Sequence, residues 1–106
     1  MSNESNDIPD ANSSTINFAS FVLSLVHTAA VHFGDVADPS TGERHPPNLQ
    51  LAQQMIDILA MLEEKTRGNL SAEERQLIDQ VLYELRMRYV EVSRAGAPPE
   101  SRIILP

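Results

Sequence analysis

The sequence predicts an all-α protein: a small three-helix domain in which the second and third helices form an antiparallel hairpin. Apolar residues recur at the i, i+3, i+4, i+7 spacing of a helix in three segments, at about 17–33, 48–66 and 71–93. Residues that cap helices or form turns stand at the boundaries of these segments. A length of 106 residues with 42% apolar content fits one domain. We therefore expect a single helical core without β-strands.

The first helix is expected to begin near Asn17 or Thr15, either of which can cap a helix start, and to end at Gly34. At about 100° per residue, its larger apolar residues fall on one side. This inner face consists of Phe18, Phe21, Val22, Leu25, Val26, Ala29 and Phe33. We expect it to pack against the other two helices.

The first helix has no charged face, because no Asp, Glu, Lys or Arg occurs between Asp10 and Asp35. A helix without charge on its outer side is typically covered by protein or by lipid. Its outer residues are small or weakly polar, which allows another helix to come close. The candidate interface residues on this side are Ser20, Ser24, His27 and Val31.

A polar connector over 35–47 separates the first two helices, and its paired Pro46 and Pro47 exclude helix there. The connector is long for a helical bundle, so we expect it to cross the end of the fold. The second helix is predicted to begin at Asn48 as its cap and to be closed by Gly68. Its inner arc consists of Leu51, Ala52, Met55, Ile56, Ile58, Leu59 and Leu62.

The third helix has the clearest start signal, because Ser71 followed by Glu74 fits a capping box. The link 67–70 is short enough to fold the second and third helices into an antiparallel hairpin. Its inner stripe is formed by Leu77, Ile78, Val81, Leu82, Leu85, Tyr89 and Val92. A second, thinner stripe offers three further candidate interface residues: Tyr83, Met87 and Val90.

Three regions follow from this reading of the helices. The domain covers 16–93, a disordered N-terminal tail covers 1–15, and a flexible C-terminal tail covers 94–106.

Composition excludes several classes of function. The formal net charge of −7 and a pI of about 4.7 oppose binding to nucleic acid. The absence of cysteine excludes disulfides and fits a cytoplasmic location. The N-terminal segment lacks the basic patch of a secretory signal, and no Lys or Arg flanks the first helix to anchor it across a membrane. We expect a cytoplasmic protein.

No motif for catalysis, metal binding or cofactor binding is found. His27 and His32 are five positions apart, which turns their rings to different sides of a helix and does not suit a shared metal. Arg86 and Arg88 also lie on different sides, and one of them is expected to pair with an acid of a neighbouring helix. We assign no catalytic residue, no metal site and no cofactor.

The small size of the core favours a homo-oligomer. Below roughly 70 to 80 residues, one core rarely supplies more than about 3 to 5 kcal/mol without a disulfide, a metal or self-association. A non-enzymatic, self-associating interaction module is therefore the preferred function, and an unidentified protein partner stays open. One alternative is a small-molecule binding protein or enzyme whose site forms on assembly around His27 or Arg86. A weaker alternative is peripheral attachment to a membrane through the first helix.

Over about 16–92 the chain resembles a small uncharacterised bacterial family, domain of unknown function 1844. The most specific segments are INFASFVLSL at 16–25, MIDILAMLEEKTRGNLS at 55–71 and LRMRYVE at 85–91. The segment 44–47, RHPP, departs from the family, where a charged and proline-poor approach to the second helix is expected. The resemblance implies a bacterial, cytoplasmic, all-helical protein, and it implies no activity, cofactor or catalytic residue.

Overall fold

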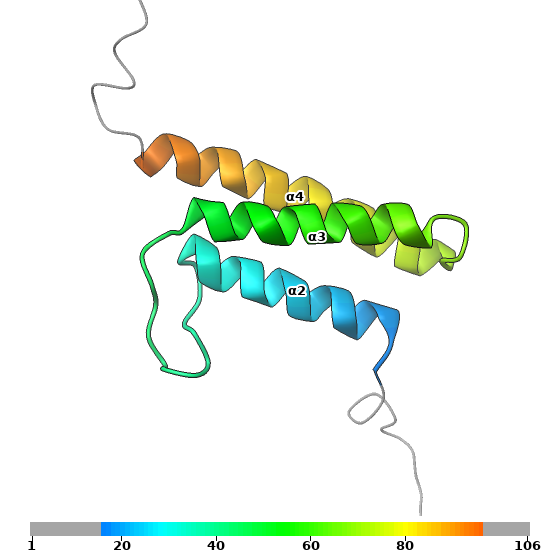
Figure 1. Cartoon of the computed structure of the whole chain (residues 1–106), viewed down its shortest axis with the longest axis horizontal. Helices are drawn as coiled ribbons and strands as arrows, with labels where there is room; N and C mark the ends of the chain where they lie inside the picture. The colour runs from blue at the N-terminus through cyan, green and yellow to red at the C-terminus, as the bar shows by residue number, and fades with distance from the viewer. Residues whose placement is uncertain (1–15, 97–106) are drawn as a thin grey trace, which may run out of the picture.

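The computed structural model describes residues 16–96, which form three helices (Figure 1). Within this range the all-α prediction is confirmed, because no strand is present and Asp38 and Glu43 form only an isolated bridge. The tail predicted over 1–15 and most of the tail predicted over 94–106 lie outside the described residues. The helices are α2 (Phe18–Phe33), α3 (Leu49–Thr66) and α4 (Ala72–Gly96).

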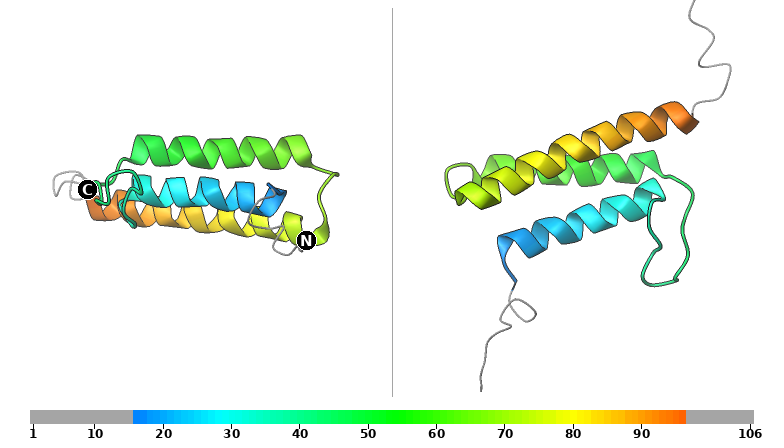
Figure 2. Two further views of the ribbon diagram at one scale, coloured as in Figure 1. Left: turned by 90° about the horizontal axis from the view of Figure 1, so that it is seen from below. Right: turned by 180° about the vertical axis from the view of Figure 1, so that it is seen from behind.

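The three helices pack side by side with their axes nearly aligned (Figures 1 and 2). The short link after α3 reverses the chain, so α3 and α4 run antiparallel, as predicted. The longer connector after α2 also reverses it, so α2 runs parallel to α4. The start of α2 and the end of α4 therefore lie at opposite ends of the bundle.

Side chains at the helix starts satisfy the free backbone amides there. The backbone N–H of Ser71 donates to Glu74 Oε1 at 2.8 Å, and the Glu74 N–H donates to Ser71 Oγ at 3.1 Å, which confirms the predicted capping box. Asn17 and Ser20 make a second box at the start of α2, with distances of 2.8 and 3.1 Å. Asn48 Oδ1 accepts the Leu51 N–H at 3.1 Å. All three predicted helix starts thus have a local chemical cause.

The helix ends differ slightly from prediction. Gly34 adopts φ = 83° at the end of α2, as expected for a left-handed cap. By contrast, α3 is capped by Arg67, and Gly68 follows it in the link with φ = 88°. The last helix does not stop near Ser93 but continues to Gly96.

The core runs along the axis between the three helices. Its largest fully buried side chains are Val22, Leu59 and Ile78, one from each helix. Buried around them are Ala29, Phe33, Ala52, Met55, Ile56, Val81, Leu82, Leu85 and Val92. The central part of each predicted apolar face is therefore correct.

Three residues predicted to face inward lie at the surface instead. Phe21 is 44% exposed, Ile58 39% and Leu51 36%. They stand at the edge of their apolar arcs, and in a bundle of only three helices the edge of an arc turns toward the outer groove between two helices. Periodicity predicts the direction of a face but does not say how much of it the neighbouring helices cover.

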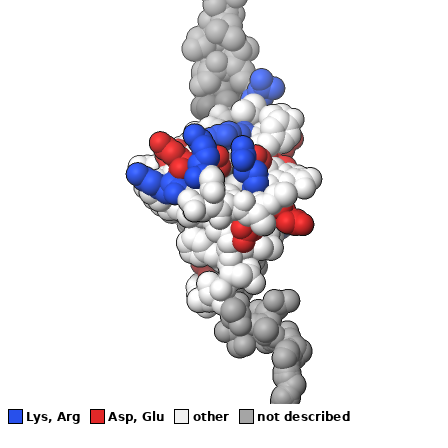
Figure 3. Space-filling model, turned by 90° about the vertical axis from the view of Figure 1, so that its right-hand side faces the viewer, with Lys and Arg blue, Asp and Glu red and all other residues white. Residues whose placement is uncertain are grey.

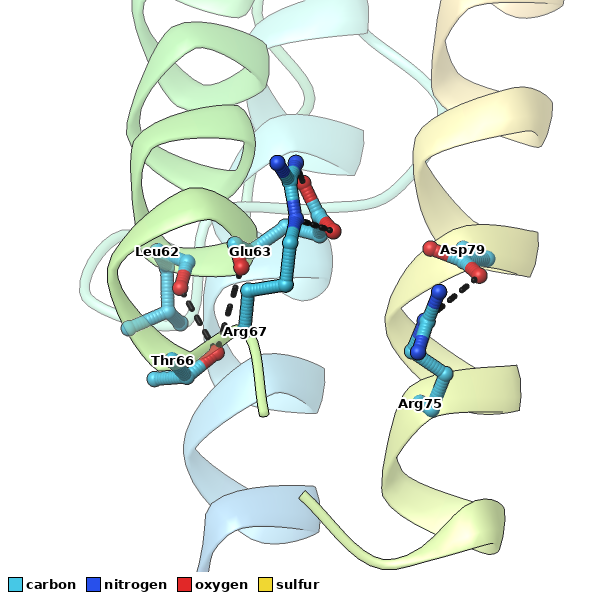
Figure 4. A network of polar contacts seen from close by, with 6 residues as sticks. All are labelled: Leu62, Glu63, Thr66, Arg67, Arg75 and Asp79. Atoms are coloured by element: carbon cyan, nitrogen blue, oxygen red, sulfur yellow. Dashed lines mark hydrogen bonds and ion pairs between the residues drawn. The ribbon is translucent and has the colours of Figure 1, made fainter. Parts of the chain in front are cut away.

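Charge is distributed unevenly over the bundle. Viewed from the end where α3 meets α4, Lys and Arg gather over these two helices, and the part of the described surface below them shows only scattered Asp and Glu (Figure 3). Some of the charged residues pair locally. Arg67 Nη2, at the cap of α3, lies 2.7 Å from Glu63 Oε1, and Arg75 Nε lies 3.5 Å from Asp79 Oδ2 within α4 (Figure 4). Hydrogen bonds from Arg67 lower the pKa of Glu63. The uncharged helix α2 therefore contrasts with two helices that carry ordinary surface charge.

Candidate functional site

The outer face of α2 carries hydroxyl groups that are already hydrogen-bonded within the helix. Ser24 Oγ donates to the Phe21 carbonyl at 2.7 Å, and Thr28 Oγ1 donates to the Ser24 carbonyl at 3.1 Å. Ser20 Oγ donates to the Asn17 carbonyl at 3.0 Å. Each of these hydroxyl hydrogens already has an acceptor, so a second protein surface could cover the hydroxyls without leaving a buried donor unpaired.

Ser20, Ser24 and His27 are exposed as predicted, whereas Val31 is not and requires a correction. Val31 is only 7% exposed, although periodicity sets it on the outer side of α2. It borders a cleft of about 500 Å³ together with Pro46, Pro47 and Leu51, because the connector folds back beside the end of α2. Val31 is therefore covered by its own chain.

Apolar side chains flank the outer face of α2. Phe21 is 44% exposed and Leu23 51%, and helical spacing sets them on opposite sides of Ser24. On α3, Leu51, Ile58 and Met61 follow one another at i, i+7 and i+10, and Met61 is 50% exposed. Leu51 borders the same cleft as Val31, so this stripe of α3 runs along the side next to α2.

The sequence reasoning missed the stripe on α3. Periodicity predicts Leu51 and Ile58 to face the core and does not assign Met61 to either face of the helix. The signal that was available is the width of the apolar arc, which is broader than two neighbouring helices can cover.

The second stripe of α4 is exposed over its whole length. Tyr83 is 65% exposed, Met87 47% and Val90 41%, at the i, i+4, i+7 spacing that aligns side chains along a helix. Toward the start of α4 the stripe borders a shallow hollow of about 680 Å³. Among the residues that line this hollow are Gln76, Asp79, Gln80 and Tyr83.

An ion-pair network joins α4 to the end of α2. Arg88 donates from Nε to Asp35 Oδ2 at 2.9 Å and from Nη2 to Asp35 Oδ1 at 2.5 Å. It also donates from Nη1 to Glu91 Oε1 at 3.0 Å. Arg44 Nη2 donates to the Asp35 carbonyl. The hydrogen bonds to Asp35, followed by that to Glu91, raise the pKa of Arg88. The sequence predicts that one arginine pairs with an acid of a neighbouring helix. Arg88 does pair across elements, but its partner Asp35 lies in the connector, just after the cap of α2.

The connector is organised around the carboxylate of Asp38. Its Oδ1 accepts from Ser40 N at 2.9 Å and from Ser40 Oγ at 2.7 Å. His45 Nε2 lies 3.1 Å from Asp38 Oδ2. These hydrogen bonds, those from Ser40 first, lower the pKa of Asp38 from 3.8 to about 2. The connector therefore has a defined local structure.

The residues suggested for a small-molecule site do not come together in this chain. His27 is exposed on α2 and Arg86 is exposed on α4, and neither lines the clefts described above. Between residues 16 and 95, no group of three or more His, Asp or Glu residues is arranged to hold a metal ion. His45 is engaged with Asp38, and His32 contributes its backbone carbonyl to the N–H of Asn48 at 2.7 Å.

None of the three described helices combines the length and the apolar content needed to cross a membrane. This finding concerns residues 16–96 alone.

Comparison with known proteins identifies a family without assigning an activity. No curated protein matches the chain, and no solved structure matches it. A family match covers residues 15–91, which includes all of α2 and α3 and most of α4. The chain therefore belongs to the family described as Domain of unknown function (DUF1844).

Proposed function

We propose that the protein is a non-enzymatic helical module that associates with further copies of itself through the outer face of α2. The observation that carries this proposal is the contrast between α2 and the other helices. An exposed face without any charged residue, flanked by half-exposed Phe21 and Leu23, is unusual for a helix whose outer side meets only water.

Burial of the apolar side chains on this face would favour association. Fully burying a large apolar side chain contributes roughly 1.5 to 3 kcal/mol, so the half-exposed Phe21 and Leu23 offer about 1 kcal/mol each per copy. Ile58 and Met61 on the adjacent side of α3 would extend the same surface. A second copy brings an equal set, because a two-fold interface uses the same residues twice.

The proposed setting is the cytoplasm of a bacterium. A net charge of −7 favours solubility, and the lack of cysteine suits a reducing compartment.

The substitution Ser24→Glu tests the α2 interface. Covering this position in an assembly would bury an unpaired carboxylate, which costs about 3 to 5 kcal/mol. The matched control is Gln50→Glu in the exposed first turn of α3, where the helix dipole favours an added acid. Gln53 is less suitable because its amide donates to Asp57 at 2.8 Å.

We expect sedimentation at micromolar concentration to give a mass above 11.7 kDa for the native chain and for Gln50→Glu. Ser24→Glu should give a smaller assembly with unchanged helicity by circular dichroism. A native chain that stays monomeric would contradict self-association itself. Equal masses for Ser24→Glu and Gln50→Glu would instead contradict the choice of the α2 face.

A further inference from the structure

Charge is divided along α4 in a way that matches the helix to an antiparallel copy of itself. From Ala72 to Glu84 the helix has four acids and one arginine, a net charge of −3. From Leu85 to Gly96 it has three arginines and one acid, a net charge of +2. A parallel pairing of two such helices would bring the acidic halves together, whereas an antiparallel pairing brings each acidic half beside a basic half.

The exposed stripe of α4 supplies the apolar centre for such a pairing. Tyr83 lies near the boundary between the two halves and is the most exposed member of the stripe, at 65%. Met87 and Val90 lie on the basic side of Tyr83, and the shallow hollow bordered by Gln76 and Gln80 lies on the acidic side. One half of the surface therefore projects side chains, and the other half is recessed.

We propose that α4 binds α4 of a second copy, antiparallel, about a two-fold axis that passes close to Tyr83. In this arrangement the rings of the two Tyr83 residues meet at the axis. Met87 and Val90 of each copy lie over the hollow of the other. A two-fold axis also brings identical flanks of the two helices together, because each copy presents the same surface to the other.

This geometry pairs two specific charged residues across the axis. Asp79 and Arg86 are seven positions apart, so they lie on the same flank of α4, on either side of Tyr83. The two-fold axis sets Asp79 of each copy opposite Arg86 of the other. Arg86 is exposed and makes no ion pair with another described residue. The Asp79 side chain is 55% exposed, and its Oδ2 pairs with Arg75 of the same helix at 3.5 Å. Its second oxygen, Oδ1, remains for a contact with Arg86 of another copy.

The α4 contact does not depend on the α2 face. A chain that uses both surfaces forms an assembly larger than a dimer, and a chain that uses only one forms a dimer. The test can therefore treat the two proposals separately.

The test reverses the two charges one at a time and then mixes the variants. Homodimers of Asp79→Arg would set arginine against Arg86 at two places, and homodimers of Arg86→Asp would set aspartate against Asp79 at two places. Each variant alone should weaken α4-mediated association roughly tenfold. An equimolar mixture restores both opposite-charge pairs, so sedimentation should recover the native mass. Glu64→Arg on the outer side of α3 is the control for a charge change of the same size, because Glu64 is exposed and makes no ion pair with another described residue.

Recovery on mixing supports the α4 contact, because a variant that is merely misfolded is not repaired by a second misfolded variant. Native mass for Asp79→Arg and Arg86→Asp at every concentration would overturn the α4 contact and leave the α2 proposal intact. Reduced mass without recovery on mixing would also overturn the proposed register. A native dimer that Asp79→Arg dissociates but Ser24→Glu does not would support α4 and contradict α2. A native chain that is monomeric would overturn both.

Discussion

Arg88 and Asp35, which are 53 positions apart in the chain, are joined by two parallel hydrogen bonds of 2.9 and 2.5 Å. A guanidinium and a carboxylate in this arrangement match each other in shape as well as in charge. The pair connects α4 to the residue that follows the cap of α2. It therefore fixes how far the end of α2 lies along α4.

Replacing Arg88 should destabilise the bundle measurably but not severely. Both side chains are exposed by a third or more, so solvent screening limits the loss for Arg88→Gln to about 1 kcal/mol. For a domain of this size that corresponds to a fall of roughly 4 to 8 °C in Tm. Thermal denaturation followed by circular dichroism measures it. Arg88→Lys should be intermediate, because an ammonium cannot make both hydrogen bonds at once.

A matched control for the Arg88 prediction is Arg67→Gln, which removes a pair with Glu63 inside α3 and the link that follows it. The Arg67 side chain is 61% exposed, so solvent screening should make this pair weaker than the pair of Arg88 with Asp35. A larger loss for Arg67→Gln than for Arg88→Gln would show that the contact between α4 and Asp35 is not a significant tie.

Gly34→Ala should destabilise the fold more than Gly68→Ala. Both glycines have positive φ, 83° and 88°, so both substitutions carry the cost of a left-handed alanine, about 1 to 2 kcal/mol. A Cβ at Gly34 would also lie 2.8 Å from the His45 carbonyl oxygen, whereas a Cβ at Gly68 meets open space. Urea denaturation measures the loss of stability in each variant. The difference between the two losses is the cost of the contact with the His45 carbonyl, and it reports how closely the connector packs on the end of α2. Equal losses would mean that the connector simply moves aside.

The connector should lose its local structure at acidic pH. Because the folded-state pKa of Asp38 is depressed from 3.8 to about 2, the stabilisation from its carboxylate is present above about 4 and is lost as the pH falls toward 2. A ¹³C NMR titration of the Asp38 carboxyl carbon measures this pKa directly. Since Ser40 makes the dominant contribution, Ser40→Ala should raise the pKa of Asp38 toward its ordinary value more than His45→Gln does. The reverse order would contradict the arrangement of the connector described above.

The helices were predictable because their signals are local. Ser71 and Glu74, which form the capping box, are only three positions apart. Gly34 can adopt its positive φ because glycine has no Cβ. The centre of each apolar face was also predictable, as Val22 and Ile78 illustrate, because periodicity depends only on neighbouring positions.

The features that escaped prediction depend on residues far apart in the chain. Val31 is buried because Pro46 and Pro47 return beside it, and no local pattern encodes the path of the connector. Phe21 is 44% exposed because it stands at the edge of its apolar arc, which the other two helices do not cover. The sequence indicated that one arginine would pair across helices, but only the packing of α4 against the end of α2 selects Arg88 over Arg86.

The candidate surfaces divide in the same way. Tyr83, Met87 and Val90 were identified from spacing alone, and their exposure agrees with an outward stripe. The exposed stripe of α3 was not predicted, because the exposure of Ile58 and Met61 depends on how many helices pack around α3, and periodicity does not give that number. Periodicity indicates where such a surface lies, but it does not identify the second molecule that binds there.

Because α2 and α4 run in the same direction, the start of α2 and the end of α4 are separated by about the length of α4, roughly 37 Å for 25 residues. An antiparallel pair formed through α4 cancels this polarity, since each end of the pair then presents the start of α2 from one copy and the end of α4 from the other. Any segment attached to either terminus of the bundle would consequently be displayed at both poles of the assembly. A module of this kind would act as a spacer with two equivalent ends, which holds two identical sets of attached segments apart.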